Sequence, residues 1–155
     1  MENVKKVSGL IGWIFLCSLA GIFGAQFEPG GWYQMLAKPS WTPPNWVFPV
    51  VWPILYVLMG ISAWLVWKMK NTSLLQTEFT WFFVQLALNA LWSWVFFGMQ
   101  LIGTGLAEIL LLWISILFTT LLFWKKNRIA GLLLIPYLLW VGYASALNFA
   151  IWHLN

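Results

Sequence analysis

The residues of this chain that could do chemistry are amides and hydroxyls placed at helical spacing. Gln85, Asn89 and Ser93 recur at intervals of four, which puts the three side chains on one face of a helix. Ser145 and Asn148 share a face of a later helix in the same way. Amides and hydroxyls donate and accept hydrogen bonds. These side chains could therefore link neighbouring helices or anchor the polar groups of a ligand, and the two roles are compatible.

Tryptophan is the second candidate group, with 14 indoles in 155 residues. Three stand at the ends of apolar stretches: Trp67, Trp124 and Trp152. Four stand well inside such stretches: Trp52, Trp92, Trp94 and Trp140. An indole N–H in apolar surroundings needs an acceptor, so we expect the interior tryptophans to face protein or a cavity. Helix packing and a ligand cavity with aromatic walls are both open interpretations.

Acid–base and metal chemistry have few residues to work with. The four acidic residues are all Glu, His153 is the only histidine, and Cys17 is the only cysteine. A Ser-His-Asp triad and a His-Glu-x-x-His zinc helix cannot be assembled from this set, and one cysteine closes no disulfide within the chain. We expect no metal site and no resident cofactor.

Two glutamates interrupt the apolar stretches. We expect Glu78 and Glu108 in the first turns of their helices, where an acid complements the helix dipole. A proton-coupled transporter would carry its carboxylate nearer the middle of the membrane. Neither residue is therefore a strong candidate for that role.

The composition is typical of a protein whose solvent is lipid. Hydrophobic residues make up 62% of the chain and charged residues 8%, too few charges to coat a soluble domain. The net charge is +4, but the basic residues stand singly or in pairs between apolar runs. That placement indicates membrane-surface loops rather than a nucleic-acid-binding patch.

Charge-free stretches predict where the chain crosses the bilayer. About 20 apolar residues span the hydrocarbon core. The longest stretch is divided by three glycines close together in the sequence, Gly98, Gly103 and Gly105. Five helices result, at about residues 7–27, 44–67, 79–98, 104–124 and 129–152. The sequence thus predicts an all-α membrane protein, a bundle of five transmembrane helices forming a single domain over residues 1–155.

Proline marks the start of the second predicted helix. We expect Thr42 as its N-cap, with proline in the first turn. Three further prolines fall inside predicted helices: Pro49, Pro53 and Pro136. Each removes a backbone donor and favours a bend, which either leaves room for a ligand or fits a neighbouring helix.

Basic residues predict the orientation. With five helices, all but one of them fall on one side of the membrane: Lys5, Lys6, Lys68, Lys70, Lys125, Lys126 and Arg128. Lys38 alone falls on the other side. The positive-inside rule then places the N-terminus in the cytoplasm, with the loop between the first two helices and the C-terminus opposite. We expect a bacterial cell membrane rather than a mitochondrial outer membrane.

Several blocks of residues resemble the translocator protein family, also called the tryptophan-rich sensory proteins or peripheral-type benzodiazepine receptors. The most specific block is residues 32–44, which contains Lys38-Pro39-Ser40-Trp41. Residues 85–89 and 136–140 supply two further blocks, in the family's order. The resemblance implies five packed helices, a possible homodimer, and a cavity beneath the loop joining the first two helices.

The resemblance also implies a ligand class and a set of binding residues. Family members bind porphyrins such as protoporphyrin IX and synthetic benzodiazepine-site ligands, and animal members bind cholesterol. By position, the corresponding cavity residues are Tyr33, Trp41, Pro43, Trp52, Asn89, Trp92, Trp140, Ala144 and Leu147. The spacing argument adds Asn148 to this set.

Two family features are missing. The cholesterol-recognition pattern Leu-x-Tyr-x-x-x-Arg becomes Leu147, Phe149 and His153 here, which argues against sterol binding. A Gly-x-x-x-Gly dimerisation face found in some relatives is replaced by Thr80 and Val84, so a dimer would need another surface.

Three functions are compatible with the sequence. The first is a receptor or transport-type membrane protein that binds tetrapyrroles, such as porphyrins and haem precursors, in a Trp-lined cavity. The second is an enzyme that breaks porphyrin down in light, as some bacterial family members do, with Trp52 and Trp140 as its candidate catalytic residues. The third is a small transporter of apolar molecules.

Overall fold

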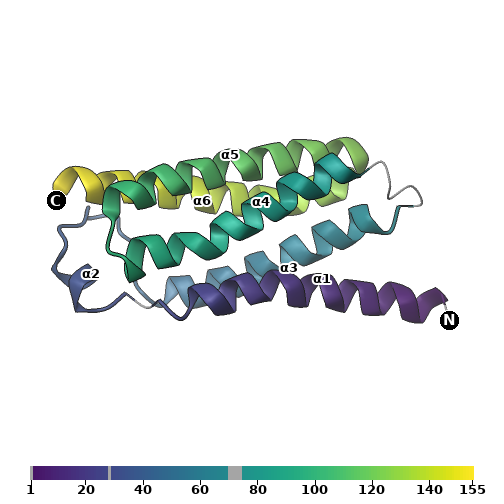
Figure 1. Ribbon diagram of the computed structural model, residues 1–155, viewed down its shortest axis with the longest axis horizontal. Coiled ribbons are helices and arrows are strands. Elements are labelled where there is room, and N and C mark those ends of the chain that lie inside the picture. The colour runs from purple at the N-terminus through teal and green to yellow at the C-terminus, as the bar shows by residue number, and fades with distance from the viewer. Residues whose placement is uncertain (1, 28, 70–74) are drawn as a thin grey trace.

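Apolar helices make up most of the chain. The structure, a computed structural model, describes residues 2–27, 29–69 and 75–155. Its elements in order are α1 (Glu2–Gly24), α2 (Gly31–Met35), α3 (Val47–Trp67), α4 (Gln76–Ser93), the π-helical turn η2 (Trp94–Gly98), α5 (Ile102–Lys126) and α6 (Arg128–Leu154) (Figure 1). Within the described residues, five helices are long and apolar enough to cross a membrane. The predicted fold class, an all-α bundle of five transmembrane helices, is confirmed.

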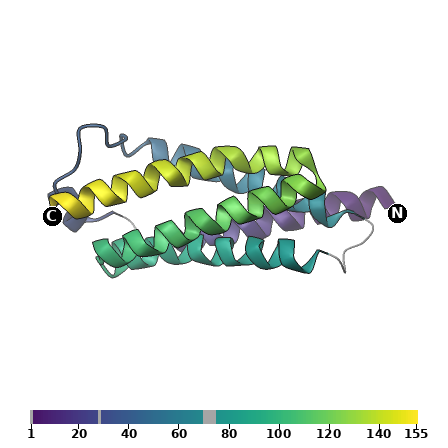
Figure 2. The ribbon, with the colours of Figure 1, turned by 90° about the horizontal axis from the view of Figure 1, so that it is seen from above.

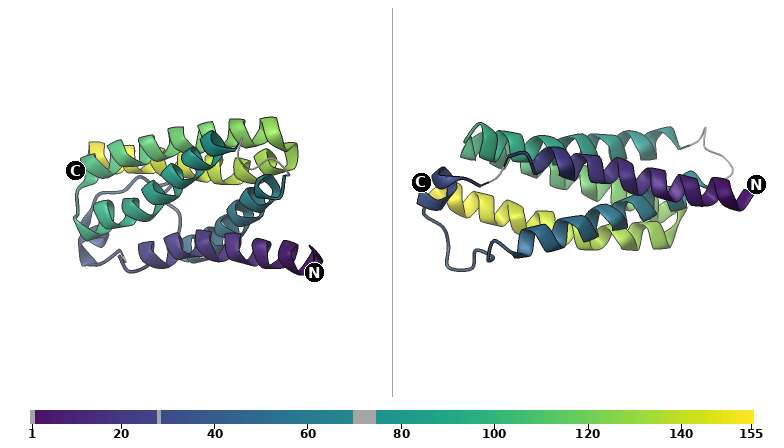
Figure 3. Two further views of the ribbon diagram at one scale, coloured as in Figure 1. Left: turned by 45° about the vertical axis from the view of Figure 1, so that its right-hand side comes forward. Right: turned by 90° about the horizontal axis from the view of Figure 1, so that it is seen from below.

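The five long helices form a closed ring. Around it, α1 packs against α3, α3 against α6, α6 against α5, α5 against α4, and α4 against α1 (Figures 2 and 3). The start of α1 and the ends of α3 and α5 lie at one end of the bundle, while α2 and the C-terminus lie at the other (Figure 1). The short helix α2 and its flanking segments therefore cover one mouth of the ring.

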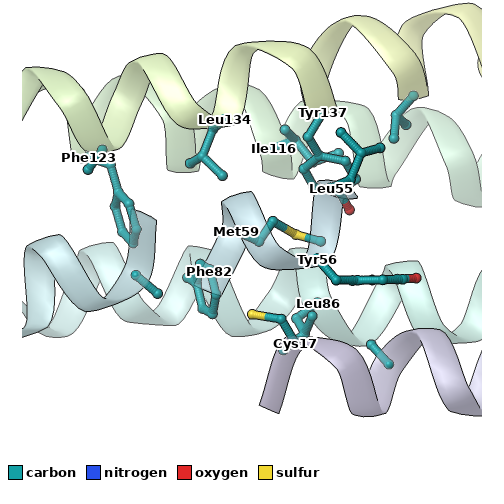
Figure 4. Close-up of a cluster of buried hydrophobic side chains, with 14 of the residues drawn as sticks. Cys17, Leu55, Tyr56, Met59, Phe82, Leu86, Ile116, Phe123, Leu134 and Tyr137 are labelled. Carbon is teal, nitrogen blue, oxygen red and sulfur yellow. The ribbon is translucent and has the colours of Figure 1, made fainter. Parts of the chain in front are cut away.

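Along its axis, the half of the bundle nearer the N-terminus is filled with apolar side chains. Phe82 of α4 stacks on Phe123 of α5 with ring centroids 5.7 Å apart, and Met59 and Leu134 pack in the same buried cluster (Figure 4). Close packing of this half fixes the positions of the helices around the other half.

The start of α3 differs from its prediction. The helix begins at Val47, and Thr42 is not its N-cap: the Thr42 amide and Oγ1 both donate to the Pro39 carbonyl, at 3.0 and 2.7 Å. A residue before proline is pushed out of the helical region, which keeps residues 42 and 43 outside the helix. Pro49 consequently lies in the first turn of α3, where it removes no helical hydrogen bond, and only Pro53 is interior to this helix.

The break before α5 also differs from its prediction. It lies at residues 99–101, where the Met99 amide donates to the Trp94 carbonyl at 2.8 Å and Gln100 has a φ of 59°. The predicted helix 79–98 begins earlier, at Gln76, and its last turn is π-helical.

Two predictions for α5 are wrong because the helix starts at Ile102. Gly103 lies inside α5 rather than before it, while Gly105 lies inside the helix, as the predicted range 104–124 places it. At Gly105 the missing side chain lets Phe96 approach, since a Cβ would lie 3.0 Å from its ring. Glu108 falls in the second turn instead of the first, because the helix begins two residues earlier than expected.

An ion pair lies at the end of the bundle opposite α2. Glu78, in the first turn of α4 as predicted, accepts from the Lys126 Nζ at 3.3 Å. Lys68, Lys126 and Arg128 lie at the ends of helices that meet here (Figure 1). Lys70 is outside the described residues.

Candidate ligand-binding cavity

A cavity of about 710 Å³ lies between the helices, in the half of the bundle nearer α2. All five long helices and η2 contribute to its wall, and the segment around α2 contributes Phe27, Pro29, Tyr33 and Asn45. Its size lies within the range of about 300–1,000 Å³ that is usual for small-molecule sites. The hollow is therefore large enough for a ligand rather than a water molecule.

Most of the binding residues expected from the sequence meet in this cavity. Its lining includes Tyr33, Trp52, Asn89, Trp92, Trp140, Ala144, Leu147 and Asn148. Trp41 and Pro43 are outside the lining. The Trp41 ring is 46% exposed and packs edge-on against Tyr143, whose hydroxyl donates to the Trp41 carbonyl at 2.6 Å.

A hydrogen-bonded chain across three helices borders the cavity, which Tyr56 and Asn89 line. The Tyr56 hydroxyl of α3 donates to Asn89 Oδ1 of α4 at 2.7 Å, and Asn89 Nδ2 donates to the Tyr137 hydroxyl of α6 at 3.0 Å. Tyr56 also stacks on Trp52, with ring centroids 5.6 Å apart. Neither tyrosine was among the expected site residues, although Tyr56 follows Trp52 by one helical turn.

A second amide links the helices higher in the wall. Asn148 Nδ2 of α6 donates to the Ile102 carbonyl at 3.2 Å, and Asn148 Oδ1 accepts from the Trp92 indole at 3.4 Å. Asn89 and Asn148 thus join helices and line one cavity at the same time. Ser145 does neither, because its hydroxyl donates to the Val141 carbonyl of its own helix at 2.8 Å.

Aromatic rings form much of the wall. Trp92 stacks on Phe96 with centroids 5.0 Å apart, and Phe48 meets Trp140 edge-on at 5.8 Å. The Trp140 Nε1 is buried and has no hydrogen-bond partner among the described residues. It is an available donor for an acceptor on a ligand.

One interior tryptophan does not face the bundle. Trp94 is 42% exposed, so the expectation that it faces protein or a cavity is wrong. It follows Asn89 by five residues, which is about 140° around a helix from the polar face. The same geometry applied to the sequence would have placed it on the lipid side.

The cover of the cavity is held by buried aromatic contacts. Tyr33 of α2 is 8% exposed and meets Phe96 and Phe97 edge-on, with centroids 6.2 and 5.4 Å away. Burial raises the pKa of the Tyr33 phenol, so this side chain stays neutral at physiological pH. The cover therefore presents a neutral phenol to the cavity.

The chemistry available in this cavity is hydrogen bonding and ring stacking. Among the described residues, no three His, Cys, Asp or Glu side chains come together in a group that could hold a metal ion. The wall instead offers indoles, phenols and amides. Such a lining suits a flat, largely apolar ligand with a few acceptor groups.

Comparison with known proteins agrees with this arrangement. The model of the TspO/MBR family matches residues 13–153, which include the second half of α1, the segment between α1 and α3, all of α3, α4 and α5, and nearly all of α6. The chain belongs to the TspO/MBR family.

Relatives of this chain come from bacteria, an archaeon (Archaeoglobus fulgidus) and mammals. The chain is 47% identical to protein CrtK of Rhodobacter capsulatus, over 90% of this chain and 88% of that one. It is 44% identical to the tryptophan-rich protein TspO of Chlorobaculum tepidum, over 97% and 98% of the two chains. The human translocator protein is 36% identical, over 94% of this chain and 89% of its own. The TspO/MBR match thus extends over nearly the full described bundle.

Proposed function

We propose that this protein binds tetrapyrroles, such as porphyrins, in the cavity beneath α2. The observation that carries the proposal is the composition of the wall: stacked indoles and phenols around about 710 Å³, with the amides of Asn89 and Asn148 among its polar groups. A porphyrin is flat and conjugated, so it gains from stacking on aromatic rings. Its carboxylates and ring nitrogens need a small number of hydrogen-bonding partners, which the amides and the Trp140 indole supply.

Quenching of tryptophan fluorescence by protoporphyrin IX tests the proposal. The double variant Trp52→Phe, Trp140→Phe removes two indoles from the wall while keeping aromatic volume. The matched control is Trp67→Phe, Trp94→Phe, which removes two exposed indoles outside the lining. We expect weaker affinity and a smaller quenched fraction in the first variant only. Equal titrations for the two variants would count decisively against the site.

A second candidate function is light-driven breakdown of the bound porphyrin. The observation that favours it is the stack of Trp52 on Tyr56, which is itself hydrogen-bonded to Asn89. An excited ligand beside Trp52 could draw an electron from this stack. Illumination of the complex should then bleach the porphyrin absorption band, with no bleaching in the dark and less in Trp52→Phe. Bleaching at the same rate in the dark, or none in light, eliminates this function.

We further propose that the covered mouth of the cavity faces away from the cytoplasm. The basic residues of α5 and α6 lie at the opposite end of the bundle from α2 (Figure 1), and the positive-inside rule assigns that basic end to the cytoplasm. A ligand would then reach the cavity from the outer side.

A further inference from the structure

The segment between α1 and α3 is tied to α6 at two points. We call residues 25–27 and 29–46, which include α2, the lid. Near its middle, Ala37 pairs with Asn155, and further along the Trp41 carbonyl accepts from the Tyr143 hydroxyl at 2.6 Å. Asn155 closes the end of α6 that lies beside α2 (Figure 1), and Tyr143 lies about three turns before it.

Asn155 matches both backbone polar groups of one lid residue. Its Oδ1 accepts from the Ala37 amide at 3.0 Å, and its Nδ2 donates to the Ala37 carbonyl at 3.0 Å. The same Nδ2 donates to the Ile151 carbonyl at 2.8 Å, which fixes the Asn155 side chain on α6. The amide is thus oriented by its own helix to hold the lid backbone.

Lys38 connects the lid backbone next to Ala37 with α2. Its Nζ donates to the carbonyls of Leu36 at 2.9 Å and Tyr33 at 2.6 Å, and it lies 4.8 Å from the centre of the Tyr33 ring. These bonds join Ala37's neighbours to the last turn of α2. Ala37 and Tyr33 are therefore parts of one braced unit.

That unit covers the mouth of the cavity. Tyr33 packs in one buried cluster with Leu147 and Ile151 of α6, which are 6% and 1% exposed. Both of these α6 side chains also line the cavity. Moving α2 away would expose them and open the cavity.

We propose that Asn155 is a positioning residue for the cavity: by pairing with Ala37 it holds the lid closed and sets how fast ligands enter and leave. Tyr143 is a second tie that acts on the same lid through Trp41. The statement about ligand rates rests on the proposed function. The statement about lid closure does not.

Thiol labelling without any ligand tests lid closure. Leu147→Cys puts a thiol under the lid, and the native Cys17 is buried, so the parent chain gives the background. In detergent, adding Asn155→Ala should raise the rate of labelling of the Leu147→Cys thiol by a water-soluble maleimide roughly tenfold, as expected from losing two hydrogen bonds. Tyr143→Phe, which removes one bond and keeps the ring, should raise the rate by a smaller factor.

Two controls separate a lid effect from general loosening. Gln34→Ala removes an exposed amide from the same lid and should leave the labelling rate of Leu147→Cys unchanged. A thiol at the other end of the bundle, Lys125→Cys, should label equally with and without Asn155→Ala. An unchanged rate for Leu147→Cys in the Asn155→Ala background would overturn the proposed tie.

Rapid-mixing kinetics with protoporphyrin IX test the effect on ligand exchange. Asn155→Ala should speed association and dissociation by a similar factor, with a smaller change in Kd. Faster labelling combined with unchanged ligand rates would overturn the role of Asn155 in exchange. If the parent protein binds no porphyrin, the proposed function fails, and the labelling experiment still decides whether Asn155 closes the lid.

Discussion

Gln85 and Asn89 lie one turn apart on α4 in opposite hydrogen-bonding surroundings. Asn89 bonds to the hydroxyls of Tyr56 and Tyr137. Gln85 is 1% exposed, and neither its Nε2 nor its Oε1 has a hydrogen-bond partner among the described residues. A buried amide without partners lowers stability, whereas a paired one links helices.

Opposite changes in stability should follow from removing these two amides. Gln85→Met keeps the shape and should raise the free energy of unfolding by about 1–3 kcal/mol. Asn89→Leu leaves two phenols without their shared partner and should lower it by about 1–2 kcal/mol. Thermal unfolding in one detergent, followed by circular dichroism, measures both. A loss of stability in Gln85→Met would show that this amide is paired in the folded protein.

Single residues were predictable where the sequence carried a periodic polar signal. Asn89 and Asn148 stood out because an amide in an apolar stretch must turn inward. Tyr56 and Tyr137 were missed because a tyrosine in such a stretch gives no comparable signal, and only their bonds to Asn89 show their place. Glu108 was expected in the first turn of its helix and lies in the second, because the start of that helix depends on the backbone at Gln100.

At the scale of helices, the close contact between α1 and α3 provides a test of the packing. A Cβ on Gly60 of α3 would lie 2.5 Å from the Ile14 Cα of α1, which is backbone and cannot turn aside. Gly12, on α1, has open space around the position of its missing Cβ. The two glycines therefore differ in what a methyl group would meet.

Adding one methyl group should change the stability of the protein differently at Gly60 and at Gly12. Gly60→Ala forces the helices apart and should lower the free energy of unfolding by about 1–3 kcal/mol. Gly12→Ala should leave stability unchanged or raise it by up to about 1 kcal/mol, since Ala is the better helix former. Thermal midpoints in detergent compare the pair, and equal midpoints would contradict the close contact at Gly60.

The sequence predicted that the five long helices exist, but it did not predict the residues at which they begin and end. The length of each apolar stretch is set by the thickness of the bilayer, so all five helices were found. The ends depend on local bonds that composition does not reveal, such as the turn in which Thr42 donates to Pro39 and the π-helical turn from Trp94 to Gly98.

For the whole molecule, a filled half and a hollow half follow each other along the bundle. Apolar packing around Phe82 and Phe123 closes the end near the basic residues. The cavity and its lid occupy the other end, beside Lys38. Under the proposed function, the side of the membrane on which the lid lies sets the compartment from which a ligand enters.

Labelling of intact cells tests that orientation. Ser40→Cys places a thiol on the exposed lid, and Lys125→Cys places one at the exposed end of α5. A membrane-impermeant maleimide should label Ser40→Cys in intact cells and Lys125→Cys only after the membrane is opened. The reverse pattern would contradict the predicted orientation.

The central claim is that a porphyrin occupies the hollow between the helices, and filling the hollow tests it most directly. Ala144→Phe adds a ring to the cavity wall, and Ala146→Phe adds the same ring two residues away on the exposed side of α6. Kd for protoporphyrin IX is measured from the shift of its absorption band, with unfolding midpoints to show that both variants fold. We expect at least a tenfold rise in Kd for Ala144→Phe, equivalent to about 1.4 kcal/mol, and no change for Ala146→Phe. Unchanged affinity in a folded Ala144→Phe variant would place the porphyrin elsewhere and contradict the claim.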